Sequence, residues 1–253
     1  MQDIFSYLTT TIQLLSQTQY SRYFIFKGGT ALVTKMVEQN RLDLYRLTTD
    51  IDIHCDKYAI WQDFCNNVES ILNRNNLNYV YKITKIRNTS NISSSITFEL
   101  YDNNINTVIQ FKMDMNIKSN NIITVEYSPM LGVNTYDATT MLADKIIVVS
   151  SGKIYRRIKD LYDIFVIISL KQLKLSDIQA HIKIKHPNAE LTNMLVQSNF
   201  EGLKHAYDKF QGITNKPDFY SLIFIIKNFL EPIYTEYKGD LVWNNANLRW
   251  YIT

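Results

Sequence analysis

Residues 23–33 read Tyr-Phe-Ile-Phe-Lys-Gly-Gly-Thr-Ala-Leu-Val. The apolar run at the start of this stretch predicts a buried strand that ends before Gly28 and Gly29, and Thr30 then begins a segment whose apolar spacing is compatible with a helix. Because glycine has no Cβ and a helix N-terminus is electropositive, such a turn can bring backbone N–H groups close to a phosphate. A Gly-Gly turn is also common as a purely structural feature. The turn alone therefore does not establish a binding site.

A pair of carboxylates follows on the next predicted strand. Residues 50–54 read Asp-Ile-Asp-Ile-His, an alternation that predicts a strand on which Asp50 and Asp52 project from the same face. Asp114 lies between apolar residues in a later strand-like stretch, where it could lie beside this pair or simply face solvent. Three carboxylates at one edge of a sheet repel one another unless a divalent cation neutralises them. The pattern predicts a magnesium or manganese site suited to phosphoryl transfer.

The order of patterns along the chain predicts a mixed α/β half followed by a helical half. Helical spacing marks residues 4–15 and 58–76. Alternating stretches, typical of strands, cover residues 79–87, 92–101 and 106–117. Beyond Pro129 the strand patterns fade, and most of the remaining chain has apolar residues at helical spacing. We therefore expect an α/β domain with a mixed β-sheet and flanking helices in residues 1–138, and a helical domain in residues 139–253.

The composition favours a folded protein in a reducing compartment. The 253 residues are 46% hydrophobic and include 17 Tyr and 12 Phe, which is enough to build a core and argues against disorder. Cys55 and Cys65 cannot form a metal quartet by themselves, and we expect reduced thiols. The first residues do not resemble a signal peptide, and no apolar run is long enough to span a bilayer. We expect a soluble cytoplasmic protein with no membrane partner.

The net charge of +3 is too small to indicate a nucleic-acid partner, but basic residues cluster in the second half of the chain. The cluster consists of Lys145, Lys153, Arg156, Arg157 and Lys159, followed by Lys171, Lys174, Lys183, Lys185 and His186. A solvated helix face explains such a run, and a surface that binds phosphates is the alternative.

Three segments resemble a known family, the AbiEii/AbiGii toxin branch of the nucleotidyltransferase superfamily. The first is Lys-Gly-Gly-Thr-Ala-Leu at residues 27–32, the second is Arg-Leu-Thr-Thr-Asp-Ile-Asp at residues 46–52, and the third is Arg-Ile-Lys-Asp-Leu-Tyr-Asp at residues 157–163. They occur in the order of the family, and the resemblance extends from residue 24 to about residue 168. It implies a nucleotidyltransferase-like fold in the first half of the chain.

The same resemblance implies roles for individual residues. It implies that the nucleotide is bound by Lys27, Gly28, Gly29 and Thr30. It implies that metal binding and catalysis depend on Asp50, Asp52 and Asp114, and that Lys145 and Asp160 have further catalytic roles. Lys145 is similar to a lysine whose ammonium can reach the triphosphate, and Asp160 resembles an acidic residue that orients the acceptor or that lysine. Spacing on a helix separately suggests Asp163 as a brace for Arg156 or Arg157.

The resemblance implies a metal-dependent, toxin-like enzyme that transfers a nucleoside monophosphate from a nucleoside triphosphate to an acceptor. RNA, such as a tRNA end, is the expected acceptor, and an antitoxin protein is a candidate partner. Two other functions stay open: a phosphotransferase on the same scaffold that modifies a protein, and a catalytically inactive module that binds a nucleotide or a partner. The latter is open because the spacing from Gly29 to Asp50 is longer than the family's usual one, and Val33 stands where an arginine is frequent.

Overall fold

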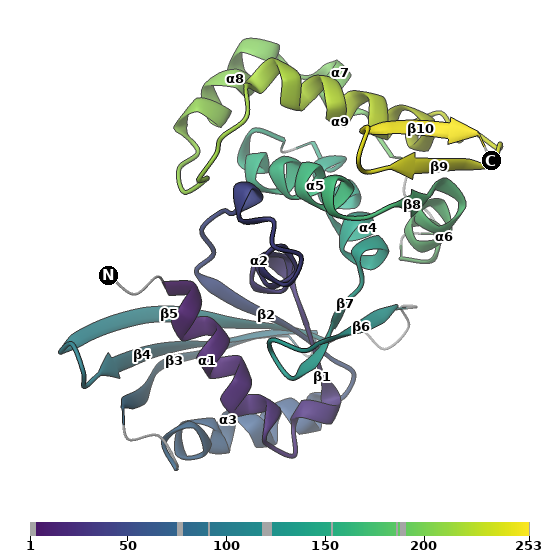
Figure 1. Ribbon diagram of the computed structural model, residues 1–253. Coiled ribbons are helices and arrows are strands. Elements are labelled where there is room, and N and C mark those ends of the chain that lie inside the picture. The colour runs from purple at the N-terminus through teal and green to yellow at the C-terminus, as the bar shows by residue number, and fades with distance from the viewer. Residues whose placement is uncertain are drawn as a thin grey trace. The chain divides into compact units, whose positions relative to one another are not determined.

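The computed structural model describes residues 4–74, 78–90, 92–117, 123–152, 154–185, 187 and 191–252 (Figure 1). The chain forms two units, and unit 1 comprises Met1–Glu38, Leu47–Asn121 and Val125–Tyr136. Unit 2 comprises Gln39–Arg46, Ile122–Thr124 and Asp137–Thr253. The boundary expected at residue 138 divides the chain once, whereas unit 2 also takes in two short segments from the first half. Lys153 and His186 of the basic cluster lie outside the described residues.

Within the described residues, unit 1 is built on a seven-stranded mixed sheet with the strand order β3-β4-β5-β2-β1-β7-β6. The strands are β1 (Phe24–Lys27), β2 (Asp50–Cys55), β3 (Tyr79–Ser90), β4 (Ser93–Asp102), β5 (Thr107–Asn116), β6 (Val125–Ser128) and β7 (Val133–Tyr136). The second strand runs antiparallel to β1 and parallel to β5. All the expected strands form. The last two, of four residues each, were not expected, because so short a segment shows too little alternation to be recognised.

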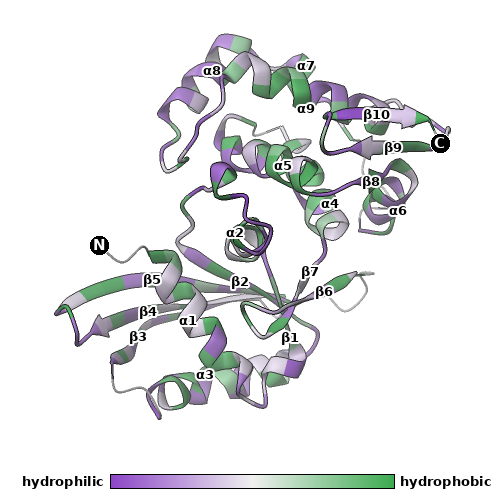
Figure 2. Ribbon diagram, viewed as in Figure 1, coloured by the Kyte–Doolittle hydropathy of each residue, from purple (hydrophilic) through white to green (hydrophobic). Residues whose placement is uncertain are grey.

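One face of this sheet is apolar and packs against α1 (Ile4–Ser16) and α3 (Tyr58–Asn73). Ile51, Ile53 and Met113 point to this side and are completely buried, in one cluster with Leu8 of α1 and Phe64 of α3. Figure 2 shows the alternation of hydrophobic and hydrophilic residues along the strands that produces this face. The polar members of β2 and β5 therefore lie on the other face.

Helix α2 (Gly28–Glu38) follows β1 directly and lies on the opposite side of the sheet from α3 (Figure 1). Its residues Ala31, Leu32, Val33 and Met36 are almost completely buried, which fixes the helix in place. The N-terminal end of α2 is thus held at the end of β1, on the face that carries the polar residues of β2.

Unit 2 is mainly helical, as expected. Its helices are α4 (Ala138–Val149), α5 (Ile158–Leu170), α6 (Leu175–Lys185), α7 (Met194–Gln197), α8 (Phe200–Lys209) and α9 (Phe219–Tyr234). The carboxylate of Asp137 caps α4 by accepting a hydrogen bond of 2.7 Å from the Thr140 N–H. Helix α5 is strongly hydrophobic (Figure 2) and packs against α4 and α9. No helix in the described part of the chain has the length and apolarity needed to cross a membrane.

A small sheet in unit 2 was not expected from the sequence. It has the order β10-β9-β8 and consists of β8 (Leu173–Lys174), β9 (Leu241–Asn244) and β10 (Arg249–Ile252). The Nε1–H of buried Trp243 donates to the Ile168 carbonyl at 2.8 Å, and that of Trp250 donates to the Phe229 carbonyl at 3.1 Å. Both indoles therefore attach the last segment to the helices.

Tyr7 connects α1 to the end of β4, and its loss should weaken unit 1. Its hydroxyl donates to Asp102 Oδ2 at 2.9 Å, and both side chains are buried. Tyr7→Phe should lower the free energy of unfolding by about 1–3 kcal/mol, because a buried carboxylate loses a donor. Tyr127→Phe is the control, since Tyr127 is 63% exposed. Urea unfolding of both variants tests this, and equal stability would show that the bond contributes nothing.

Candidate functional site

Gly28 begins α2 in a backbone conformation that favours glycine, with φ of +66°. A Cβ at this position would lie 1.9 Å from Asp52 Oδ2, which is far inside van der Waals contact. Glycine is therefore required for two independent reasons. The same close approach means that the carboxylate of Asp52 lies against the first residue of the helix.

The pairing of three central strands brings the candidate carboxylates onto one face. Lys27 on β1 pairs with Asp52 on β2, and Asp52 pairs with Asp114 on β5. In the next row, Asp50 pairs with Lys112. Directly paired residues point to the same side of a sheet, and neighbouring strands lie about 4.8 Å apart. The structure thus places three carboxylates and two lysines together on the polar face of the sheet.

The long segment between Gly29 and Asp50 does not separate the glycine turn from the carboxylates. Lys27 and Asp52 are paired, and the Thr30 hydroxyl donates to the backbone oxygen of Asp50 at 2.6 Å. Thr30 is only 1% exposed. Its hydroxyl therefore holds β2 against α2.

The three carboxylates are suitable ligands for a hard divalent cation, because they carry oxygen donors and lie on the same face of the sheet. Asp50, Asp52 and Asp114 offer the oxygen ligands that Mg²⁺ and Mn²⁺ prefer, and the missing Cβ of Gly28 lets the Asp52 carboxylate lie directly against the start of α2. In their present positions, no three carboxylate, imidazole or thiol groups of the described residues converge as a metal site would require. Asp114 is instead bound by Lys112, whose Nζ lies 2.6 Å from Oδ1 and 2.8 Å from Oδ2.

Sequence reasoning assigned no role to Lys112, although the alternation of β5 contained the necessary signal. Lys112 stands two residues before Asp114, and residues at this spacing on a strand share a face. A lysine two residues from a candidate ligand is therefore placed to form an ion pair with it.

Unit 2 contains a second cluster of charges, centred on Asp163. Lys145 Nζ lies 2.6 Å from Asp160 Oδ1 and 2.7 Å from Asp163 Oδ2. Arg46 binds the two oxygens of Asp163 through Nε at 2.5 Å and Nη2 at 2.9 Å. The side chains of Arg46 and Asp163 are at most 1% exposed, whereas Lys145 is 15% exposed. The cluster is therefore a buried ion network, and its lysine retains some contact with solvent.

The charges of this network support one another. Burial alone would raise the pKa of Asp163, but Arg46 and Lys145 hold it well below its usual range. Burial alone would lower the pKa of Lys145, but Asp163 and Asp160 hold it above its usual value. Both groups are therefore charged at neutral pH, and Lys145 presents a fixed ammonium.

The expected brace between Asp163 and Arg156 or Arg157 is wrong. Asp163 faces the core and binds Arg46 and Lys145, while Arg157 stands at the N-terminal end of α5 with a side chain that is 46% exposed. Arg157 Nη1 lies 3.7 Å from Asp160 Oδ2 instead. Arg46 was missed as the partner because it precedes Asp163 by 117 residues, and no local pattern connects them.

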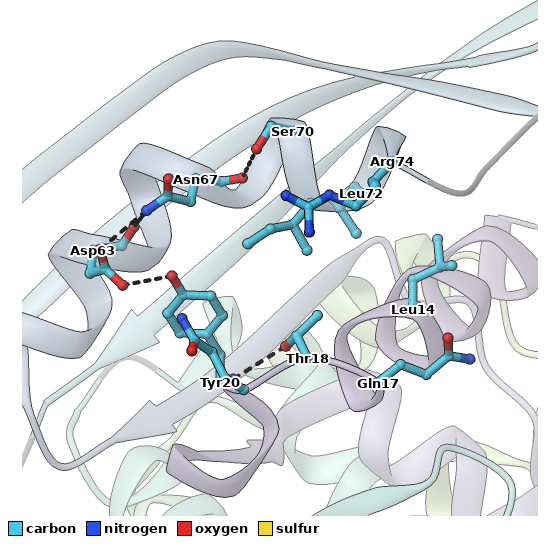
Figure 3. Close-up of a pocket in the computed structure, with 11 residues that line it drawn as sticks. Leu14, Gln17, Thr18, Tyr20, Asp63, Asn67, Ser70, Leu72 and Arg74 are labelled. Atoms are coloured by element: carbon cyan, nitrogen blue, oxygen red, sulfur yellow. Dashed lines mark hydrogen bonds between the residues drawn. The ribbon is translucent and has the colours of Figure 1, made fainter.

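A cleft of about 540 Å³ is lined by residues of α1, α3 and the segment that follows α1 (Figure 3). None of the candidate site residues lies in it. It is lined by Leu14, Gln17, Thr18, Gln19, Tyr20, Asp63, Asn67, Ser70, Ile71, Leu72 and Arg74. Three of its polar side chains bind one another: the Tyr20 hydroxyl donates to Asp63 at 2.6 Å, and Asn67 Nδ2 donates to Asp63 at 3.1 Å. The chemistry of the carboxylate face makes that face the better candidate for a functional site.

The family model for the nucleotidyl transferase AbiEii toxin of type IV toxin–antitoxin systems matches residues 12–210. The chain belongs to this AbiEii family. All nine candidate residues fall within the match, and membership makes the protein a nucleotidyltransferase of the toxin type. No curated protein matches the sequence.

Two solved structures share the fold of this AbiEii protein. JHP933 from Helicobacter pylori is 13% identical with a TM-score of 0.59, and the similarity covers 91% of this chain and 90% of that one. A putative nucleotidyltransferase from H. pylori is 12% identical with a TM-score of 0.53, covering 92% of this chain and 94% of that one. The expected nucleotidyltransferase-like fold is thereby confirmed.

Replacing Gly28 should measure the contact with Asp52. Gly28→Ala introduces a Cβ that clashes with the carboxylate, whereas Gly152→Ala, at φ of +81°, introduces one with no atom within 4 Å. Both variants carry the cost of a positive φ, about 1–2 kcal/mol. Gly28→Ala should lose at least about 1 kcal/mol more in denaturant unfolding. Adding Asp52→Ala should recover part of that excess, and equal losses in the two single variants would contradict the contact.

Asp163→Asn should destabilise the AbiEii protein at neutral pH by about 3–5 kcal/mol, because two buried cations lose their shared anion. The pKa of Asp163 is lowered on folding, so its contribution to stability is present above the ordinary pKa of about 3.9 and is lost as the pH falls below it. Denaturant unfolding from pH 7 to pH 3 should show a smaller loss in the variant than in the parent. Asp240→Asn, at an exposed position, should match the parent at every pH.

Proposed function

We propose that this AbiEii protein transfers a nucleoside monophosphate from a nucleoside triphosphate to an RNA acceptor, using Mg²⁺ or Mn²⁺. The observation that carries the proposal is the contact between Asp52 and Gly28, which joins the carboxylate face to the N-terminus of α2. A helix N-terminus suits phosphate, and carboxylates suit the cation that accompanies a triphosphate. One end of the central sheet therefore offers both kinds of group.

In this proposal the triphosphate lies at the start of α2. Gly28, Gly29 and Thr30 contribute backbone N–H groups, and Lys27 contributes a positive charge next to them. Asp50 and Asp52 hold the divalent cation, with Asp114 as the third ligand. When bound, the cation balances the charge of the triphosphate and of the reacting oxygens.

Catalytic roles are also proposed for Lys145 and Asp160, which belong to unit 2. The ammonium of Lys145 is suited to bind a phosphate oxygen because the network keeps it charged and oriented. Asp160 orients Lys145, because its carboxylate accepts a hydrogen bond of 2.6 Å from the Lys145 ammonium. The neighbouring Asp163 holds the same ammonium from the buried side.

Unit 2 is the proposed surface for the RNA. Arg156, Arg157, Lys159, Lys171, Lys174 and Lys183 are exposed. Lys145 and Lys185, by contrast, are used in ion pairs inside the unit. Exposed basic side chains bind a polyanion by releasing its counterions. A cytoplasmic location, where nucleotides and RNA are found, is part of this proposal, and a type IV toxin family implies an antitoxin as a further partner.

Labelled triphosphates test the reaction. With label in the α position, the parent should transfer label to RNA, whereas label in the γ position should reach no acceptor. Transfer of γ label to a protein would instead show a phosphotransferase. If neither label is transferred, the protein is a catalytically inactive module that binds a nucleotide or a partner.

The double variant Asp50→Asn/Asp52→Asn should lose α-label transfer by at least about a hundredfold. Glu99→Gln is a matched control, because Glu99 is a half-buried carboxylate on the same face of the sheet, where it pairs with Gln110. Without ligand the double variant should be at least as stable as the parent, since a like-charge repulsion is removed. Only the parent and the control should gain thermal stability from magnesium plus nucleotide. An equal gain in the double variant would make these aspartates structural.

A further inference from the structure

Lys112 lies among the carboxylates that the proposed function assigns to the metal. It is the strand partner of Asp50, and it stands two residues before Asp114 on β5. Its Nζ is 2.6 Å from one oxygen of Asp114 and 2.8 Å from the other. A single ammonium thus engages both oxygens of the third carboxylate.

This contact uses lone pairs that a divalent cation would need. Each carboxylate oxygen accepts from few directions, and an ammonium placed between the two oxygens covers the side on which a metal is chelated. The side chains of Lys112 and Asp114 are 42% and 34% exposed. Ion pairs exposed to this degree are weak, so a competing ion can replace the ammonium.

We propose that Lys112 is a built-in competitor of the metal at Asp114, which lowers the affinity of the site and thereby sets the metal concentration at which the protein is loaded. This inference rests on the proposed function, because it concerns the same carboxylates. Without metal, the ammonium reduces repulsion among Asp50, Asp52 and Asp114. With metal, Lys112 must release Asp114, because a +1 group at this position repels a +2 ion.

If Lys112 competes with the metal, its removal should change the metal affinity in the opposite direction from the removal of a residue that supports the site. A residue that only holds Asp114 in position would weaken metal binding when removed. A competitor strengthens metal binding when removed, and any cationic replacement preserves the competition. The sign of the change therefore distinguishes the two roles.

Binding of Mn²⁺ alone, measured by calorimetry or by the electron paramagnetic resonance of free Mn²⁺, provides the test. Lys112→Met should bind Mn²⁺ roughly two- to tenfold more tightly than the parent. Lys112→Arg should bind like the parent because it keeps the charge. Lys82→Met is the matched control, because this substitution removes the same charge. Lys82 pairs with Glu99 on the same face of the sheet and lies on β3, two strands away from β5. The rise in melting temperature caused by Mn²⁺ should also be larger in Lys112→Met.

The possible results separate the inference from the proposed function. If the parent binds Mn²⁺ and Lys112→Met binds it no more tightly, the inference is overturned and the metal site stands. If Lys82→Met tightens binding as much as Lys112→Met, the effect is one of net charge, and the inference is again overturned. If neither the parent nor any variant binds Mn²⁺, the proposed metal site fails, and the inference fails with it.

Discussion

The carboxylate of Asp52 lies in the space that a Cβ on residue 28 would occupy. A Cβ on residue 28 would stand 1.9 Å from an Asp52 oxygen, and the backbone there has a positive φ. The pairing of Lys27 with Asp52 brings these residues together, and the bond from Thr30 to the Asp50 carbonyl secures the helix beside the strand. The start of α2, the register of β1 on β2 and the positions of the acidic side chains thus depend on one close approach.

The charged clusters of the two units differ in how deeply they are buried. In unit 2, Arg46 and Lys145 neutralise Asp163 at full burial, with short contacts on both of its oxygens. Such a network resists rearrangement, because moving one member breaks a buried ion pair and leaves the remaining charges less well compensated. In unit 1, the acidic side chains and Lys112 are only partly buried, and their contacts can be exchanged at small cost. The first arrangement keeps Lys145 charged and in one position, whereas the second lets Asp114 exchange its partner.

The sequence predicted the parts of the fold that repeat a pattern over several residues. Alternation identified β2 and β5 and put Asp50 and Asp52 on one face, and the glycine pair marked the start of α2. Short strands such as β7 and β8 were missed, because two to four residues carry no usable period. Lys112 could have been recognised from its position two residues before Asp114. The partnership of Arg46 with Asp163 could not, because tertiary folding alone brings together residues so far apart in the chain. The roles of Lys145 and Asp160 came from family resemblance, and they remain predictions.

The separation of 117 residues between Arg46 and Asp163 also affects how the chain is made. A ribosome adds about 5–20 residues per second, so Arg46 is synthesised roughly 6–23 seconds before its counter-ion. During that interval its guanidinium has to stay in water, because burial without Asp163 would strand a charge. Residues 39–46, although they precede β2 in the chain, therefore cannot reach their final environment until α5 has been synthesised. The nascent chain therefore carries an unfinished segment through more than a hundred residues of elongation.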